Sequence, residues 1–291
     1  MILEKYFNQT NKPLLLDGAI GSLLEQKNYK SKKYLWTSYL NFKQPKVVQE
    51  IYKSYAKAGA DILTTNTFRT NPVSLNKSNT TLNCEQAVKL SANLTKEITR
   101  KYKLLLAGSN PPAEDCYQKG RTISKNELLD NHHKHISLLY ENGCDFILSE
   151  TQSHLDEIEI ILNFCKEKNI PHAISLYLLK GLNLLSGESI TEVLDFIKSY
   201  SPLFISFNCI SKNIFYDIIN KVKLDFNWGF YLNCGSENFN NNFVCELSPK
   251  EYSEIVNYSL TLKPKIIGAC CGSNPLHIKS IRKMLDENFT S

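Results

Sequence analysis

Short apolar segments rich in Leu, Ile and Phe alternate with longer amphipathic segments along the whole chain. Nearly continuous apolar runs of this length are typical of strands covered on both faces, as in a parallel sheet flanked by helices. The segments of this kind, which we predict to be strands, are residues 14–17, 61–66, 104–108, 146–150, 173–178, 203–208, 229–233 and 265–269. The pattern therefore predicts an α/β protein.

The segments between these strands have helical periodicity and recognisable ends. Residues 45–58 carry apolar side chains at helical spacing, and Gly59 follows as a helix stop. Residues 248–251 form a capping-box sequence with Pro at the first helical position. Segments 57–63 and 141–148 both run from a helix end through Gly and Asp into an apolar strand. Such repeated joints indicate a series of βα units.

No linker rich in Pro, Ser or Gly divides the 291 residues, so we predict one domain covering 1–291. Strands alternating with helices in this number predict a (β/α)₈ (TIM) barrel. The alternative is an open, doubly wound sheet, which needs a Gly-rich phosphate-binding turn after the first strand. Residues 17–21 follow that strand but lack the third Gly of the dinucleotide fingerprint, which favours the barrel.

Composition narrows the class of function. The formal net charge is +5 and the Lys residues are dispersed, without the basic stripe and interleaved aromatics of a nucleic-acid surface. No apolar run approaches the length of a membrane span, and the polar first residues do not resemble a secretion signal. Nine cysteines, an odd number without regular spacing, are typical of reduced thiols in a cytoplasmic protein.

Polar and reactive residues follow the predicted strands. In barrels of this class the active site lies at the carboxyl ends of the strands, so these residues are expected to share one rim. They are Asp17-Gly18, Asn66-Thr67, Gly108-Ser109-Asn110, Glu150-Thr151, Asn208-Cys209, Asn233-Cys234 and Cys270-Cys271-Gly272.

Three of the rim cysteines form a candidate metal site. Cys270 and Cys271 follow the last predicted strand, and Cys209 follows another. Three thiolates with an open fourth position suit a catalytic zinc ion that takes up a sulfur substrate. Because neighbouring residues of a strand point to opposite faces, the pair can share an ion only if the chain bends, which Gly268 and Gly272 permit. An isolated Cys-Cys pair is more often core packing, but Cys209 at a matching strand end favours the metal.

These motifs resemble those of the homocysteine S-methyltransferase family. The similar segments are LLLDGAIGSLL (14–24), AGADILTTNTF (58–68), the Asn-Cys pair at 208–209 and IIGACCGSNPLHI (266–278), so the resemblance covers nearly the whole chain. It implies a (β/α)₈ barrel in which Cys209, Cys270 and Cys271 hold zinc. It also implies that the homocysteine thiolate occupies the open position on the metal.

The resemblance further implies that Asp17 and Glu150 bind the amino end of homocysteine, and two carboxylates at one rim favour an ammonium group. Taken singly, Asp17 is also a common turn former before Gly, and Glu150 an ordinary strand-end charge. The other residues that we predict to bind substrate are Gly18, Asn66, Thr67 and Asn208.

The chain departs from the family pattern at several places. Ala269 replaces the Gly that usually precedes the Cys pair, and Cys234 stands where relatives tend to carry a small residue. The loop in 108–120 differs from its commonest form, which bears on the methyl donor. It contains Cys116, which we do not expect to be a metal ligand.

The charge of the predicted site constrains the methyl donor. Zinc with three protein thiolates and a substrate thiolate is negatively charged, which favours a cationic donor. We predict S-methylmethionine, with S-adenosylmethionine and a betaine-type donor as alternatives. Two other possibilities are a non-catalytic zinc-thiolate barrel that binds thiol amino acids and a metal-free barrel enzyme with core cysteines.

The histidines offer a competing metal site. His132, His133 and His135 cluster on one predicted helix, which we interpret as a solvated face outside the barrel. His277 is expected to be structural, and His154 to lie near the barrel mouth.

Overall fold

The computed structural model of the chain describes residues 2–235 and 246–289, and its strands form one parallel sheet. The strands are β1 (Leu14–Leu15), β2 (Ile62–Thr64), β3 (Leu105–Asn110), β4 (Phe146–Gln152), β5 (His172–Leu176), β6 (Ile205–Asn208), β7 (Trp228–Leu232) and β8 (Ile266–Ala269). Their order is β1-β8-β7-β6-β5-β4-β3-β2. The sheet closes because the backbone N–H of Asp61 donates to Leu15 O at 2.7 Å and that of Asp17 donates to Ile62 O at 3.0 Å.

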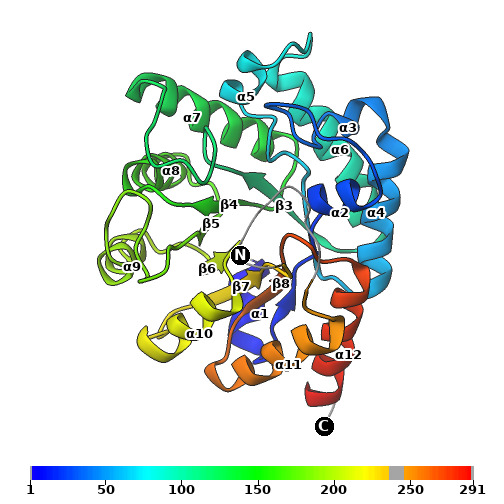
Figure 1. Ribbon diagram of the computed structural model, residues 1–291, viewed down its shortest axis with the longest axis vertical. Helices are drawn as coiled ribbons and strands as arrows, with labels where there is room; N and C mark the ends of the chain where they lie inside the picture. Colours follow the sequence, from blue (N-terminus) through cyan, green and yellow to red (C-terminus); the bar gives the residue numbers. More distant parts are fainter. Residues whose placement is uncertain (1, 236–245, 290–291) are drawn as a thin grey trace.

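Helices surround the strands, which confirms the predicted (β/α)₈ barrel (Figure 1). They are α1 (Ile2–Gln9), α2 (Gly21–Gln26), α3 (Leu40–Lys43), α4 (Pro45–Ala58), α5 (Pro72–Lys77), α6 (Cys84–Tyr102), α7 (Lys125–Glu141), α8 (Leu155–Glu167), α9 (Ile190–Lys198), α10 (Lys212–Lys221), α11 (Pro249–Ser259), the 3₁₀ turn Leu260–Leu262 and α12 (Pro275–Phe289). The predicted Gly59 stop is present with φ 98°, as is the capping box at Ser248 and Glu251. Helices α1, α2, α3 and α5 were not expected from the sequence.

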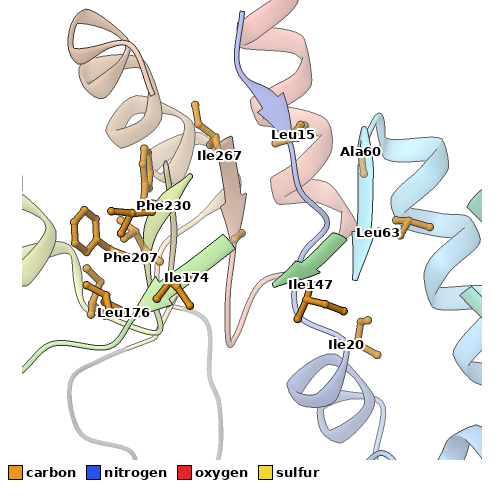
Figure 2. Close-up of a cluster of buried hydrophobic side chains, with 14 of the residues drawn as sticks. Leu15, Ile20, Ala60, Leu63, Ile147, Ile174, Leu176, Phe207, Phe230 and Ile267 are labelled. Atoms are coloured by element: carbon orange, nitrogen blue, oxygen red, sulfur yellow. The ribbon is translucent and has the colours of Figure 1, made fainter. Parts of the chain in front are cut away.

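Side chains of the strands alternate between two buried layers, as the pleat requires. One layer fills the barrel interior and includes Leu14, Leu16, Ile62, Ala107, Phe146, Leu148, Ala173, Phe204, Tyr231 and Ile266. The other packs against the helices and includes Leu15, Leu63, Ile147, Ile174, Phe207, Phe230 and Ile267 (Figure 2). The strands therefore have no solvent face, which explains their continuous apolar runs.

Helix α1 packs its apolar side chains against the interior of the barrel. Leu3 and Phe7 are buried with the inner layer, and the ring of Phe7 lies edge-on to that of Phe204 at 6.4 Å. Phe204 in turn meets Phe146 at 5.9 Å. These residues precede or begin their strands, so the contact lies at the amino ends of the strands. The opposite end remains for the site.

Strands β7 and β8 pack closely at Gly229. A Cβ atom at this position would lie 2.4 Å from the backbone oxygen of Ile266, its partner on β8. We therefore expect Gly229→Ala to lower the free energy of unfolding by about 1–3 kcal/mol, because the neighbouring backbone cannot yield. The measurement is urea denaturation of both proteins.

Gly120→Ala is the matched control. A Cβ at Gly120 meets no atom within 4 Å, so the free energy of unfolding should change by less than about 0.5 kcal/mol. An equal loss in the two variants would contradict the packing argument.

The described helices include none with both the length and the apolar character needed to cross a lipid bilayer. The cysteines in the described ranges are free thiols, and Cys245 lies outside those ranges.

Candidate metal and substrate site

A cavity of about 590 Å³ opens at the carboxyl ends of the strands. Its lining includes four of the residues predicted to bind substrate, namely Asp17, Gly18, Asn66 and Glu150, and all three predicted metal cysteines. The volume lies within the usual range for a site that binds small molecules.

The three cysteines converge at this cavity from two strand ends. The sulfur of Cys209 lies 2.8 Å from that of Cys270 and 4.0 Å from that of Cys271. Strand β8 ends at Ala269, so the Cys pair lies beyond the regular strand, and Gly272 turns the chain with φ 85°. Cys209 itself has a left-handed backbone, φ 55°, directly after β6. These bends answer the objection that adjacent cysteines of a strand point apart.

The donor set fits a zinc ion. All three sulfurs lie within 4.8 Å of one another. In a tetrahedral site with Zn–S bonds of about 2.3 Å, ligand sulfurs are about 3.8 Å apart. The separation of Cys209 and Cys271 is close to that value, and the shorter Cys209–Cys270 contact needs only a small side-chain rotation. Hydrogen bonds from Cys209 and Cys271 lower the pKa of Cys270, while the pKa of each of those two thiols is raised, so without a metal the cluster favours a single thiolate.

Asp17 and Glu150 place two carboxyl groups in the same cavity. Asp17 accepts hydrogen bonds from the backbone N–H of Thr64 at 2.9 Å and from its hydroxyl at 3.1 Å. Glu150 accepts one from the hydroxyl of Ser109. Burial raises the pKa of Asp17 well above its usual range, and it raises the pKa of Glu150 to about 7. Because burial disfavours the negative charges, a cation between them would be bound favourably.

Thr67 and Asn208 are buried outside the cavity lining, where their side chains bond to protein groups. The hydroxyl of Thr67 donates to Ser109 O at 2.7 Å. The side chain of Asn208 accepts from the backbone N–H of Thr151 at 2.9 Å and donates to its hydroxyl at 2.8 Å. Thr151 has φ 58°, an unusual conformation for a β-branched residue, directly after Glu150. Thr67 and Asn208 thus hold the residues next to the carboxylate.

Several cavity residues were missed by sequence analysis. Trp36, Phe68 and Arg69 line one side, and Tyr117 lies on the loop between β3 and α7. The rings of Trp36 and Phe68 meet edge-on at 6.0 Å. These residues lie in long loops rather than at strand ends, so the strand pattern contained no signal for them. Cys116, on the same loop, lines the cavity but lies outside the three-cysteine cluster.

The interpretation of the histidine helix as a solvated face was wrong. His132 and His135 are fully buried, because α7 turns this face toward β3 and α8. The side chain of Asn110 bonds to both rings, and His132 Nε2 lies 2.6 Å from Glu157 Oε1. The same oxygen accepts from the backbone N–H of Ala113 at 2.7 Å. These side chains therefore anchor the loop that carries Cys116 and Tyr117. His277 is buried, as expected of a structural residue.

Burial lowers the pKa of His135 to about 3, which predicts an acid sensitivity of the fold. An unfolded His titrates near 6.5, so between these pH values the unfolded chain binds one more proton at this site. The free energy of unfolding should then fall as the pH falls, by about 1.4 kcal/mol per pH unit from His135 alone. The measurement is urea denaturation at several pH values between about 6 and 4. The plot of the free energy of unfolding against pH should be less steep by this amount in His135→Gln than in wild type. Equal slopes would contradict the prediction.

Comparisons with known proteins identify the family and agree with the barrel fold. The model of the family described as homocysteine S-methyltransferase matches residues 14–285. Homocysteine S-methyltransferase 1 of Brassica oleracea var. italica is 22% identical, over 98% of this chain and 97% of its own. The homocysteine S-methyltransferase YbgG of Bacillus subtilis is 23% identical over 92% and 93%. The crystal structure of the metallated homocysteine methyltransferase MmuM from Escherichia coli superposes with a TM-score of 0.81 at 19% identity, covering 97% and 99% of the two chains.

Proposed function

Since the chain belongs to the homocysteine S-methyltransferase family, we propose that it transfers a methyl group from a cationic donor to the sulfur of homocysteine, forming methionine. We further propose that a zinc ion held by Cys209, Cys270 and Cys271 serves this reaction. The observation that carries the proposal is the presence of the three thiols and the carboxyl groups of Asp17 and Glu150 in one cavity.

The chain's own residues orient the acceptor. Asp17 and Glu150 bind the ammonium group of homocysteine, and Gly18 and Asn66 contact its amino-acid end. Thr67 and Asn208 hold Ser109 and Thr151 in place, so that the Glu150 carboxylate keeps its position. A zinc ion at the cysteines would keep the homocysteine thiol ionised at neutral pH, where a free thiol is mostly protonated.

The donor that we propose is S-methylmethionine, with S-adenosylmethionine and a betaine as the alternatives. Each has a cationic sulfonium or quaternary ammonium centre that becomes neutral as its methyl group leaves, which suits a cavity with anionic sulfurs and two carboxyl groups. Aromatic faces attract such cations, and Trp36, Phe68 and Tyr117 line this cavity. We expect this chemistry to take place in the cytoplasm, where thiols stay reduced.

The test is to purify the protein under reducing conditions, measure its zinc content and assay methionine formation from homocysteine with each of the three donors. One zinc per chain and turnover with S-methylmethionine would support the whole proposal. Turnover with only another cation would change the donor and keep the reaction. Homocysteine binding without product would indicate a binding protein, and protein without zinc would contradict the metal site.

A further inference from the structure

Arg69 is a cation at the rim of the cavity. It lies in the loop after β2 and is only partly buried, whereas Asp17 on the cavity floor is 2% exposed. Its guanidinium carbon lies 5.2 Å from the centre of the Phe68 ring, and its Nη1 donates to the backbone oxygen of Glu114 at 2.7 Å. Phe68 and Glu114 both line the cavity, so these two contacts place the guanidinium between lining residues.

The carboxylate of Glu114 is already engaged elsewhere. The Glu114 carboxylate accepts from Lys77 Nζ at 2.6 Å and from the backbone N–H of Thr122 at 2.7 Å. Partial burial opposes ionisation, but these bonds outweigh it and lower the pKa of Glu114 to about 2. Arg69 reaches only the backbone oxygen of that residue, and within 2–235 and 246–289 its guanidinium forms no ion pair. One face of a positioned guanidinium is thus left for an anion.

We infer that Arg69 binds the carboxylate of the methyl donor. The inference rests on the proposed function, since S-methylmethionine, S-adenosylmethionine and betaine all carry a carboxylate as well as their cationic centre. The donor would present its cationic centre to the cysteine cluster and the aromatic side chains, and its carboxylate to the rim. Homocysteine would keep its own ammonium group on the floor, at Asp17 and Glu150.

Arg is well suited to this role. Its planar fork binds a carboxylate through two parallel hydrogen bonds, whereas an ammonium group acts as a point charge. The contact with the Phe68 ring and the bond to Glu114 restrict the orientation of the guanidinium before the donor arrives, which lowers the entropy lost on binding. Lys33 also lines the cavity and lies 5.0 Å from the centre of the Tyr34 ring, but it is exposed and its ammonium group lacks the planar fork of Arg.

The test compares donors with and without the carboxylate by calorimetric titration of the zinc-loaded protein. The two pairs are S-methylmethionine with its decarboxylated form, (3-aminopropyl)dimethylsulfonium, and S-adenosylmethionine with decarboxylated S-adenosylmethionine. In at least one pair, wild type should bind the carboxylate form roughly 10- to 100-fold more tightly, the range expected for a hydrogen-bonded charge pair. Arg69→Gln should reduce that ratio to near one without weakening the decarboxylated form, and Arg69→Lys should restore part of it.

Lys33→Gln is the matched control, because it removes one positive charge from the same cavity. It should keep the wild-type ratio. The inference is overturned if Arg69→Gln keeps the preference, if Lys33→Gln loses as much, or if wild type shows no preference in either pair. A carboxylate preference without methionine formation would leave the Arg69 site standing and remove the proposed reaction. Equal binding of both forms with normal methionine formation would remove the Arg69 site and leave the proposed reaction standing.

Discussion

Replacing Cys271 with Ser is expected to remove bound zinc and lower the rate of methyl transfer by about a thousandfold or more. Cys271 supplies one of three sulfurs that lie within 4.8 Å of one another, and a hydroxyl is a poor substitute for a thiolate ligand. Loss of the metal removes several kcal/mol of activation of the substrate sulfur, and each 1.4 kcal/mol is about tenfold in rate. The measurements are zinc content per chain and methionine formation from homocysteine.

Cys116→Ser is the matched control for this variant. Cys116 is also a buried thiol of the cavity lining, but it lies outside the cluster. The control should keep both zinc and turnover. If Cys271→Ser retained them, or if Cys116→Ser lost them to the same extent, the three-cysteine assignment would be wrong.

Glu150→Gln is expected to raise KM for homocysteine roughly 10- to 100-fold. The amide has nearly the same shape but lacks the negative charge, and a hydrogen bond between charged groups contributes about 1.5–3 kcal/mol. Zinc content should stay at the wild-type value, because the proposed metal ligands are the clustered cysteines and Glu150 is not among them. Initial rates at saturating donor concentration give the measurement.

An acceptor that lacks the ammonium group distinguishes loss of the contact between Glu150 and that group from general damage to the cavity. With 4-sulfanylbutanoate as the acceptor, wild type and Glu150→Gln should have similar kcat/KM values. This acceptor has no ammonium group, so neither protein can form the charged hydrogen bond that Glu150 is proposed to make. A large loss with this acceptor too would show that Glu150 supports the cavity in some other way. Asp17→Asn should behave like Glu150→Gln, because both carboxyl groups are proposed to bind the same cation.

The barrel could be predicted because its strands are covered on both faces. Leu14 and Leu16 point into the interior while Leu15 faces the helices, so the strand sequence is apolar without a break. Helix α1 was missed because, with eight residues, it is too short for its periodicity to stand out from the polar residues around it. Leu3 and Phe7 stand four residues apart, which is helical spacing, yet only the tertiary contact with Phe204 shows their purpose.

The site was partly predictable for a similar reason. Residues at the carboxyl ends of the strands, such as Cys209 just after β6 and Glu150 near the end of β4, are brought to one rim by the topology alone. The contacts that orient them depend on loops and on helix packing, which local pattern does not encode. His132 was assigned to a solvated face because the helices of such a barrel lie outside it, away from the mouth. Arg69 lies in a loop, so no predicted strand end indicated its position.

The seam between β1 and β2 has a consequence for how the protein is made. Asp61 accepts from the backbone N–H of Leu15 at 2.8 Å and from Arg282 of α12 at 2.5 Å. The contact between β1 and Asp61 thus depends on Arg282, which is translated near the end of the described residues. A nascent chain that stops before residue 270 contains Cys209 without Cys270 and Cys271. Such a chain has neither the complete ligand set nor a closed wall beside Asp17. The proposed metal site can therefore be complete only after nearly all of the described residues have been translated.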